Sequence, residues 1–199
     1  MKQEILNKGI EWTKKLLNKN ITYTELGSIS YLLYGKKPSE QSINIKFGYF
    51  GEFLTKELIK DSENFELLNC GIQLVQDNNK DIDLIFKDKI NNIIYYRELK
   101  GNIKLDTEKL EATHNKCLTI KNHLIKEFKD HNINYGILNW SIYNRNNLKS
   151  EFATIRKFEK NNLKIDHFED FLKILNINWN EKEFYDYFKY LGDLIIKNN

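Results

Sequence analysis

The stretch Asp81–Asn102, DIDLIFKDKINNIIYYRELKGN, contains two short apolar runs separated by a polar segment. The runs lie near Ile82–Lys87 and Asn92–Lys100, and they are rich in the Ile, Phe and Tyr residues that favour strands. Because only residues 88–91 separate them, the stretch predicts an antiparallel hairpin. Acidic residues open the first run, and a Glu and a Lys end the second. The pairing of the two strands therefore decides whether these charges meet.

A turn centred between Ile90 and Asn91 would set the pairing of the charged residues. It places Asp83 opposite Glu98 and Asp81 opposite Lys100. Directly paired residues point to one face, with Cβ atoms roughly 5 Å apart, so all four groups would share one patch. A slip of one residue would instead turn the acids and the lysine to opposite faces.

Such a patch has the groups needed for phosphodiester hydrolysis. Two neighbouring carboxylates repel each other, which raises one pKa or recruits a cation. Mg²⁺ takes one or two carboxylates together with water and phosphate oxygens, and it lowers the pKa of a bound water. The Lys100 ammonium can hold that water or the developing negative charge. The alternative is a solvated hairpin end, since an E-x-K triplet is common in a chain that is 30% charged and recurs at Glu127–Lys129.

Composition limits the class of protein. With 199 residues, 41% hydrophobic and 13% aromatic, the chain is long and apolar enough for one folded domain. It contains no apolar run of about 18 residues and no signal-peptide h-region, so we expect a cytoplasmic protein that makes no contact with a membrane. A net charge of +3 permits nucleic-acid binding without requiring it.

Several common chemistries lack their motifs. The chain has no GxxxxGK[ST] or GxGxxG phosphate loop and no GxSxG nucleophile elbow. Cys70 and Cys117 form no CxxC pair and are expected to be reduced thiols, and the histidines lack HExxH spacing, so zinc is not expected.

Hydrophobic periodicity predicts the remaining elements. Helices are predicted at about 2–18, 24–35, 42–60, 104–129, 166–175 and 181–197. Strands are predicted at 65–76, with a bend at Gly71, and at 133–140, in addition to the hairpin. This mixture predicts an α/β fold rather than a helical bundle or a β-sandwich.

The pattern of Asp83 followed by Glu98-Leu99-Lys100 resembles that of the PD-(D/E)xK nuclease superfamily, and most of all its type II restriction endonucleases. In that family an Asp opens one core strand and an E-x-K triplet follows on the next; here the two acids are 15 positions apart. Ile82 stands where many members have Pro. The run ELKGNIKLDTEK is similar to the family's segment after the catalytic strand, and SEQSINIKFGYFGE is similar to its preceding core helix.

The resemblance implies a fold and a set of site residues. The fold is a restriction-endonuclease-like core at about 42–140, a central mixed β-sheet flanked by helices, within a single domain 1–199 that has helical segments at 1–40 and 141–199. The implied catalytic residues are Asp83, Glu98, Lys100 and, as an accessory contact, Glu52; the implied ligands of Mg²⁺ are Asp83, Glu98 and the Leu99 carbonyl. Asp83 is preferred to Asp81 because it alone opens the apolar run and pairs with Glu98.

Polar residues near the implied site predict contacts with double-stranded DNA. Hydroxyls, amides and cations at the start of the 42–60 helix, after the second hairpin strand and in YNRNNLK can reach phosphates or base edges. They are Ser39, Gln41, Ser42, Lys46, Asn102, Lys104, Arg145 and Asn146. A palindromic site predicts a homodimer, and the aromatic-rich segment 181–197 fits either its interface or the core. A restriction–modification system would also place a cognate DNA methyltransferase gene nearby.

Three functions remain open at this point. The first is a Mg²⁺-dependent, sequence-specific double-strand DNA endonuclease, which is a phosphodiester hydrolase of a restriction–modification system. The second keeps the PD-(D/E)xK fold but acts as a junction resolvase, a repair nuclease or a phage nuclease. The third is a non-enzymatic DNA-binding protein whose hairpin end is merely solvated.

Overall fold

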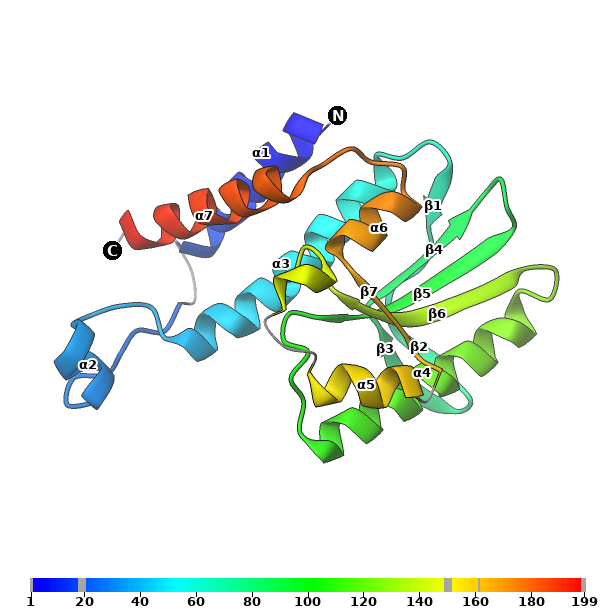
Figure 1. Ribbon diagram of the computed structural model, residues 1–199, viewed down its shortest axis with the longest axis horizontal. Helices are drawn as coiled ribbons and strands as arrows, with labels where there is room; N and C mark the ends of the chain where they lie inside the picture. The colour runs from blue at the N-terminus through cyan, green and yellow to red at the C-terminus, as the bar shows by residue number, and fades with distance from the viewer. Residues whose placement is uncertain (1, 18–20, 149–151, 161, 198–199) are drawn as a thin grey trace. The chain divides into compact units, whose positions relative to one another are not determined.

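The computed structural model describes residues 2–17, 21–148, 152–160 and 162–197 (Figure 1). The chain forms two compact units, which are described separately. Unit 1 comprises Met1–Leu54 and Trp179–Asn199, and unit 2 comprises Thr55–Asn178. Among the helices of the described residues, none combines the length and the apolar character needed to cross a membrane.

Unit 2 is built on a five-stranded mixed sheet. Across the sheet the order is β1 (Phe65–Leu67), β4 (Leu84–Asp88), β5 (Ile93–Lys100), β6 (Asn132–Asn139) and β7 (Lys164–His167). β1, β4 and β5 are antiparallel neighbours, whereas β5, β6 and β7 run parallel. Parallel neighbours need a crossover, and helices supply it here.

Helices cover both faces of this sheet (Figure 1). α4 (Thr107–Glu127) and α5 (Ala153–Lys160) lie on one face, where α4 links β5 to β6 and α5 lies between β6 and β7 in the chain. α6 (Phe168–Ile174) lies on the other face. The predicted α/β fold with a central mixed sheet flanked by helices is therefore confirmed.

The strands alternate between the two faces, as the pleat requires. Ile85 and Tyr96 belong to the core cluster that α4 and α5 complete, and both are buried. Phe86 and Tyr95 point the other way and stack with ring centroids 4.9 Å apart, and Phe86 also meets Phe171 of α6 edge-on at 6.1 Å. Residues 83 and 98 belong by this alternation to the α4 face, which is where the charged groups of the hairpin gather.

The turn between β4 and β5 fixes the register of the hairpin. The Asp88 carboxylate accepts hydrogen bonds from the backbone N–H groups of Ile90 and Asn91, at 2.9 and 3.0 Å, and from the Asn91 side chain at 2.8 Å. Asn92 takes a positive φ of 53°, a conformation that Asn tolerates better than most residues. The resulting pairs, Leu84 with Arg97 among them, confirm the predicted register for β4 and β5.

The register does not continue to Asp81. β3 (Asn78–Ile82) pairs with β2 (Gly71–Val75) in a separate two-stranded sheet, where Asp81 lies opposite Ile72. The prediction that Asp81 faces Lys100 is therefore wrong. The predicted strand at 65–76 is in fact two strands, because Gly71 has a φ of 92° and the chain leaves the main sheet after β1.

Other boundaries also differ from prediction. The helix expected at 24–35 is confined to α2 (Ile29–Tyr34), whose N-terminal turn is capped by the Ser28 hydroxyl. α5 was not predicted, and β7 precedes α6 where a single helix was expected. Because β7 is the fifth strand of the sheet, the sheet extends beyond the predicted core at 42–140 into the segment expected to be a helical addition.

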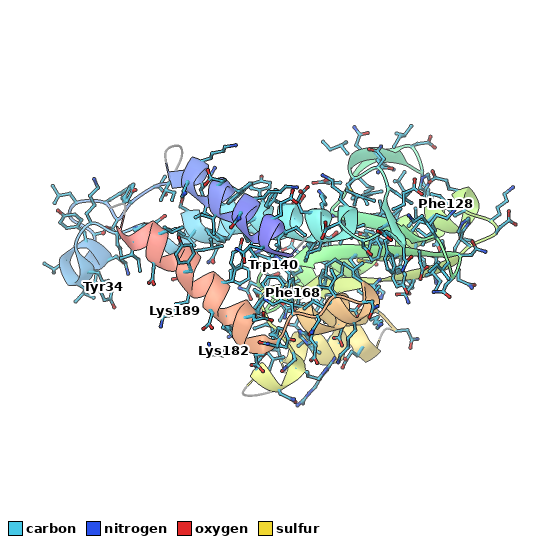
Figure 2. All side chains as sticks on the ribbon, turned by 90° about the horizontal axis from the view of Figure 1, so that it is seen from above. Tyr34, Phe128, Trp140, Phe168, Lys182 and Lys189 are labelled. Atoms are coloured by element: carbon cyan, nitrogen blue, oxygen red, sulfur yellow. The ribbon has the colours of Figure 1, made fainter. Side chains whose placement is uncertain are left out.

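Unit 1 is helical, as predicted for the two ends of the chain. It contains α1 (Lys2–Leu17), α2, the first part of α3 (Glu40–Lys60) and α7 (Glu181–Lys197). Trp12, Phe50 and Phe53 form an aromatic cluster that Tyr187 and Phe188 of α7 complete. Tyr187 and Phe188 of α7 thus belong to this core, whereas Tyr185 and Tyr190 of the same helix are exposed. Lys182 and Lys189 of α7 and Tyr34 of α2 are also exposed (Figure 2).

We predict that Gly136→Ala destabilises the sheet by about 1–3 kcal/mol. A Cβ at Gly136 of β6 would lie 2.4 Å from the backbone carbonyl oxygen of Lys164, so the parallel β6–β7 pair would have to separate. Gly48→Ala in α3 is the matched control. A Cβ there meets nothing within 4 Å, and Ala favours a helix over Gly, so its stability should hold or rise. Thermal unfolding would compare the two, and equal midpoints would contradict the prediction.

Candidate active site

The two predicted acids come together where the paired strands of the hairpin end. Asp83 immediately precedes β4, and Glu98 is the third residue from the end of β5. The Leu84–Arg97 pair is adjacent to both, so the ladder sets them side by side. One Asp83 oxygen, Oδ2, accepts a hydrogen bond from the Leu99 backbone N–H at 2.8 Å, which locks the acid against β5.

Lys100 joins this pair from the last residue of β5. Its Nζ lies 2.9 Å from Glu98 Oε1, two residues back along the same face of the strand. The Glu98 side chain is 5% exposed and that of Lys100 is 24% exposed, so the acid is buried while the ammonium reaches toward solvent. The structure thus brings together the Asp83, Glu98 and Lys100 side chains that the sequence singled out.

A second lysine, Lys116 of α4, lies against both acids and was not predicted. Its Nζ is 2.5 Å from Glu98 Oε2 and 3.5 Å from Asp83 Oδ1. The sequence does contain a signal for it. Lys116 is spaced by three and four residues from the buried Thr113 and Ile120, and such spacing puts a helical residue on the buried face.

Burial and charge set opposite pKa shifts on the two acids. Burial, together with the nearby Glu98 charge, raises the pKa of Asp83 from 3.8 to about 6, although Lys116 and the Leu99 N–H oppose the rise. Burial also acts to raise the pKa of Glu98, but the charges of Lys100 and Lys116 outweigh it and lower that pKa. Two acids with environments that differ in this way are typical of functional sites.

The raised pKa of Asp83 predicts a stability that falls as pH rises. Because the folded state holds this proton more tightly than the unfolded state, stability is lost between about pH 4 and pH 6. Asp83→Asn removes the effect and should stabilise the metal-free protein by on the order of 1–3 kcal/mol at pH 7.5, with little change at pH 4. Urea unfolding in EDTA at both pH values measures it. A variant less stable than wild type at pH 7.5 would contradict the assignment.

The donor set at this site suits a hard divalent cation. Asp83 Oδ1 and Glu98 Oε2 face the same Lys116 ammonium, so they converge on one position that a cation already occupies. Among the described residues no three His, Cys, Asp or Glu side chains gather as a metal site. Two carboxylates are nonetheless what Mg²⁺ commonly takes from a protein, the remaining ligands being water and phosphate oxygens. The Leu99 carbonyl stays a predicted further ligand.

Two further acids have different surroundings. Asp81 is exposed on β3, where its charge contributes to raising the pKa of Lys116 against the effect of burial. Asp83 remains the better candidate ligand because it contacts Leu99 and Lys116 directly. Glu52 lies on α3 in unit 1 and is half-buried, and its accessory role stays a prediction.

The predicted DNA contacts at the start of α3 include two serines with local structural roles. The Ser39 hydroxyl accepts a hydrogen bond from the Ser42 N–H at 3.2 Å and pairs with the Thr22 hydroxyl at 2.9 Å. Ser42 is buried, and its hydroxyl accepts from the Thr22 N–H at 3.1 Å. Gln41 is exposed and Lys46 is half-buried. Gln41 is therefore more accessible to a ligand than the serines.

The predicted DNA contacts of unit 2 are on its surface. Asn102, Lys104, Arg145 and Asn146 are all exposed. Asn102 Oδ1 accepts from the Lys104 N–H at 2.9 Å, which shapes the loop after β5, and Arg145 pairs with Glu159 at 2.6 Å. These residues are accessible to a polyanion, and their contact with DNA stays a prediction.

The comparisons with known proteins add no family to this geometry. No protein-family model matches the chain, and no curated protein matches it. The case for a function rests on the site itself.

Proposed function

We propose that this protein is a Mg²⁺-dependent, sequence-specific double-strand DNA endonuclease with a restriction-endonuclease-like core. The observation that carries the proposal is the convergence of Asp83, Glu98 and Lys100 on one face of a mixed sheet. Two antiparallel strands bring the acids together, and α4 crosses over to a parallel β6 beside them. The resemblance implies a central mixed sheet flanked by helices, and the presence of such a sheet here supports the proposal.

The chemistry proposed for the site is hydrolysis of a phosphodiester bond. Bound Mg²⁺ would supply Lewis-acid polarisation of a phosphoryl oxygen and a water of lowered pKa. Asp83 and Glu98 would hold the ion through the oxygens that now face Lys116. Lys100 would position the attacking water and offset the negative charge that develops on the phosphate. Its partial exposure leaves its ammonium accessible to a substrate.

The substrate and assembly follow from the same proposal. Asn102 and Lys104 follow β5 directly and are exposed, so under this proposal they would contact the DNA backbone near the scissile phosphate. A palindromic site read by one small subunit calls for a homodimer, which light scattering would detect. A restriction–modification role further requires a DNA methyltransferase that modifies the same sequence.

Incubation with long DNA of known sequence tests the proposal directly. With Mg²⁺ we expect discrete fragments whose sequenced ends share one motif, and with EDTA we expect intact DNA. Smears, or nicks confined to branched or damaged DNA, would instead indicate a resolvase or a repair or phage nuclease with the same core. No Mg²⁺-dependent cleavage of linear, supercoiled or branched DNA would leave the non-enzymatic DNA-binding protein as the better explanation.

A further inference from the structure

The four carboxylate oxygens of the acid pair fall into two groups by their partners. Asp83 Oδ2 accepts from the Leu99 N–H, and Glu98 Oε1 is held by Lys100. The other two oxygens, Asp83 Oδ1 and Glu98 Oε2, share the Lys116 ammonium, and Glu98 Oε2 also accepts a hydrogen bond from the Tyr96 hydroxyl at 3.2 Å. Lys116 thus bridges the one oxygen of each acid that is bonded neither to the Leu99 N–H nor to Lys100, and we take these two oxygens as the candidates for a metal ion.

An ammonium and a divalent cation cannot occupy this position together. Mg²⁺ binds carboxylate oxygens at roughly 2.0–2.1 Å, a distance that leaves no room for a lysine hydrogen between them. The two cations would also repel each other strongly, because Glu98 is buried and the site is poorly screened by water. Binding of a divalent ion therefore requires that Lys116 leave.

Lys116 is able to leave. Its side chain is 22% exposed, so it has access to solvent, and a lysine has a flexible four-carbon stem. Asp83 and Glu98, by contrast, are fixed to the end of β5 by the Leu99 N–H, by Lys100 and by the Tyr96 hydroxyl, which donates to Glu98 at 3.2 Å. The acids would stay in place while the ammonium moves.

We propose that Lys116 is a positioning residue that acts as the resident counter-ion of the Asp83–Glu98 pair. It holds the two acids together in the metal-free protein, competes with the divalent cation and so sets the cation concentration at which the site fills. The inference rests on the proposed function, since it concerns the same cation site. If Lys116 were only a structural partner of the two acids, it would not compete with the divalent cation.

Calorimetric titration with Mn²⁺ in the absence of DNA tests the competition. Lys116→Met should bind the ion at least tenfold more tightly than wild type. Lys126→Met is the matched control, because Lys126 is an exposed residue of the same helix and its loss changes the net charge equally. Its affinity should stay within twofold of wild type. An unchanged or weaker affinity of Lys116→Met would overturn the inference, and so would an equal gain in both variants.

Amine labelling of the wild-type protein gives a second readout that needs no substitution. Mn²⁺ should increase acetylation of Lys116 several-fold by releasing it from the acids, while acetylation of Lys126 stays constant. Reduced or unchanged labelling of Lys116 at saturating Mn²⁺ would overturn the inference even if the variant failed to fold.

If neither wild type nor Lys116→Met binds Mn²⁺, the proposed metal site fails together with the inference. If wild type binds the ion and cleaves DNA but Lys116 shows no competition, only the inference fails.

Discussion

Asp83→Asn and Lys100→Met should each lower Mg²⁺-dependent DNA cleavage by about 10²–10³-fold or more. Asp83→Asn removes the charge that would hold the cation, and Lys100→Met removes the ammonium 2.9 Å from Glu98 that would position the water. Neither change adds bulk at the hairpin, so the fold and DNA affinity should persist. Initial cleavage rates, measured with a fluorescent duplex that contains the site, check the activity.

The second E-x-K triplet of the chain supplies the control. Lys129 follows the end of α4 and is exposed, so Lys129→Met should leave the rate within about twofold of wild type. Gel-shift binding in EDTA should show that all three variants retain DNA affinity. Full activity in both Asp83→Asn and Lys100→Met would remove the active-site assignment. Because Asp83→Asn is also expected to stabilise the metal-free protein at pH 7.5, its loss of activity could not be attributed to unfolding.

The hairpin could be predicted because the residues that determine it are close together in the sequence. The strong β-formers on each side of a short polar segment fix both strands and limit the choice of register. The Asp88 carboxylate then selects one turn by accepting from two consecutive N–H groups. The meeting of Asp83 and Glu98 follows from that turn alone.

The elements and the residue that the sequence did not predict are determined by contacts with distant parts of the chain. β3 reads NNKDI, and its pairing with β2 cannot be inferred from so polar a segment. β7 reads KIDH, and its Asp166 and His167 are buried although both are polar, so the alternation expected of a strand is hidden. Lys116 occupies a half-buried helical position, between the buried Thr113 and Ile120, where periodicity favours an apolar residue. In each case a tertiary partner determines the structure.

Arg97→Met should destabilise the protein by about 3–5 kcal/mol, because it leaves a buried carboxylate without its main counter-charge. Arg97 and Asp166 are each 1% exposed, with Arg97 Nη2 2.7 Å and Nε 2.8 Å from Asp166 Oδ2. The guanidinium also donates to the Asn134 side chain at 2.7 Å and to the Tyr96 and Asn134 carbonyls. These bonds link β5, β6 and β7, so their loss weakens the parallel half of the sheet.

The double variant Arg97→Met/Asp166→Leu separates the charge effect from the loss of packing. Replacing both partners by apolar side chains removes the unpaired charge, and such replacements are often near neutral in stability. We therefore expect the double variant to regain most of the stability that Arg97→Met loses, as measured by urea unfolding followed by circular dichroism. Additive losses in the double variant would contradict this account and would indicate that Arg97 stabilises the sheet through its carbonyl contacts instead. Asp166 also lies 3.1 Å from the exposed Lys164. If the double variant regains its stability, Arg97 rather than Lys164 is the main group that neutralises the buried Asp166 carboxylate.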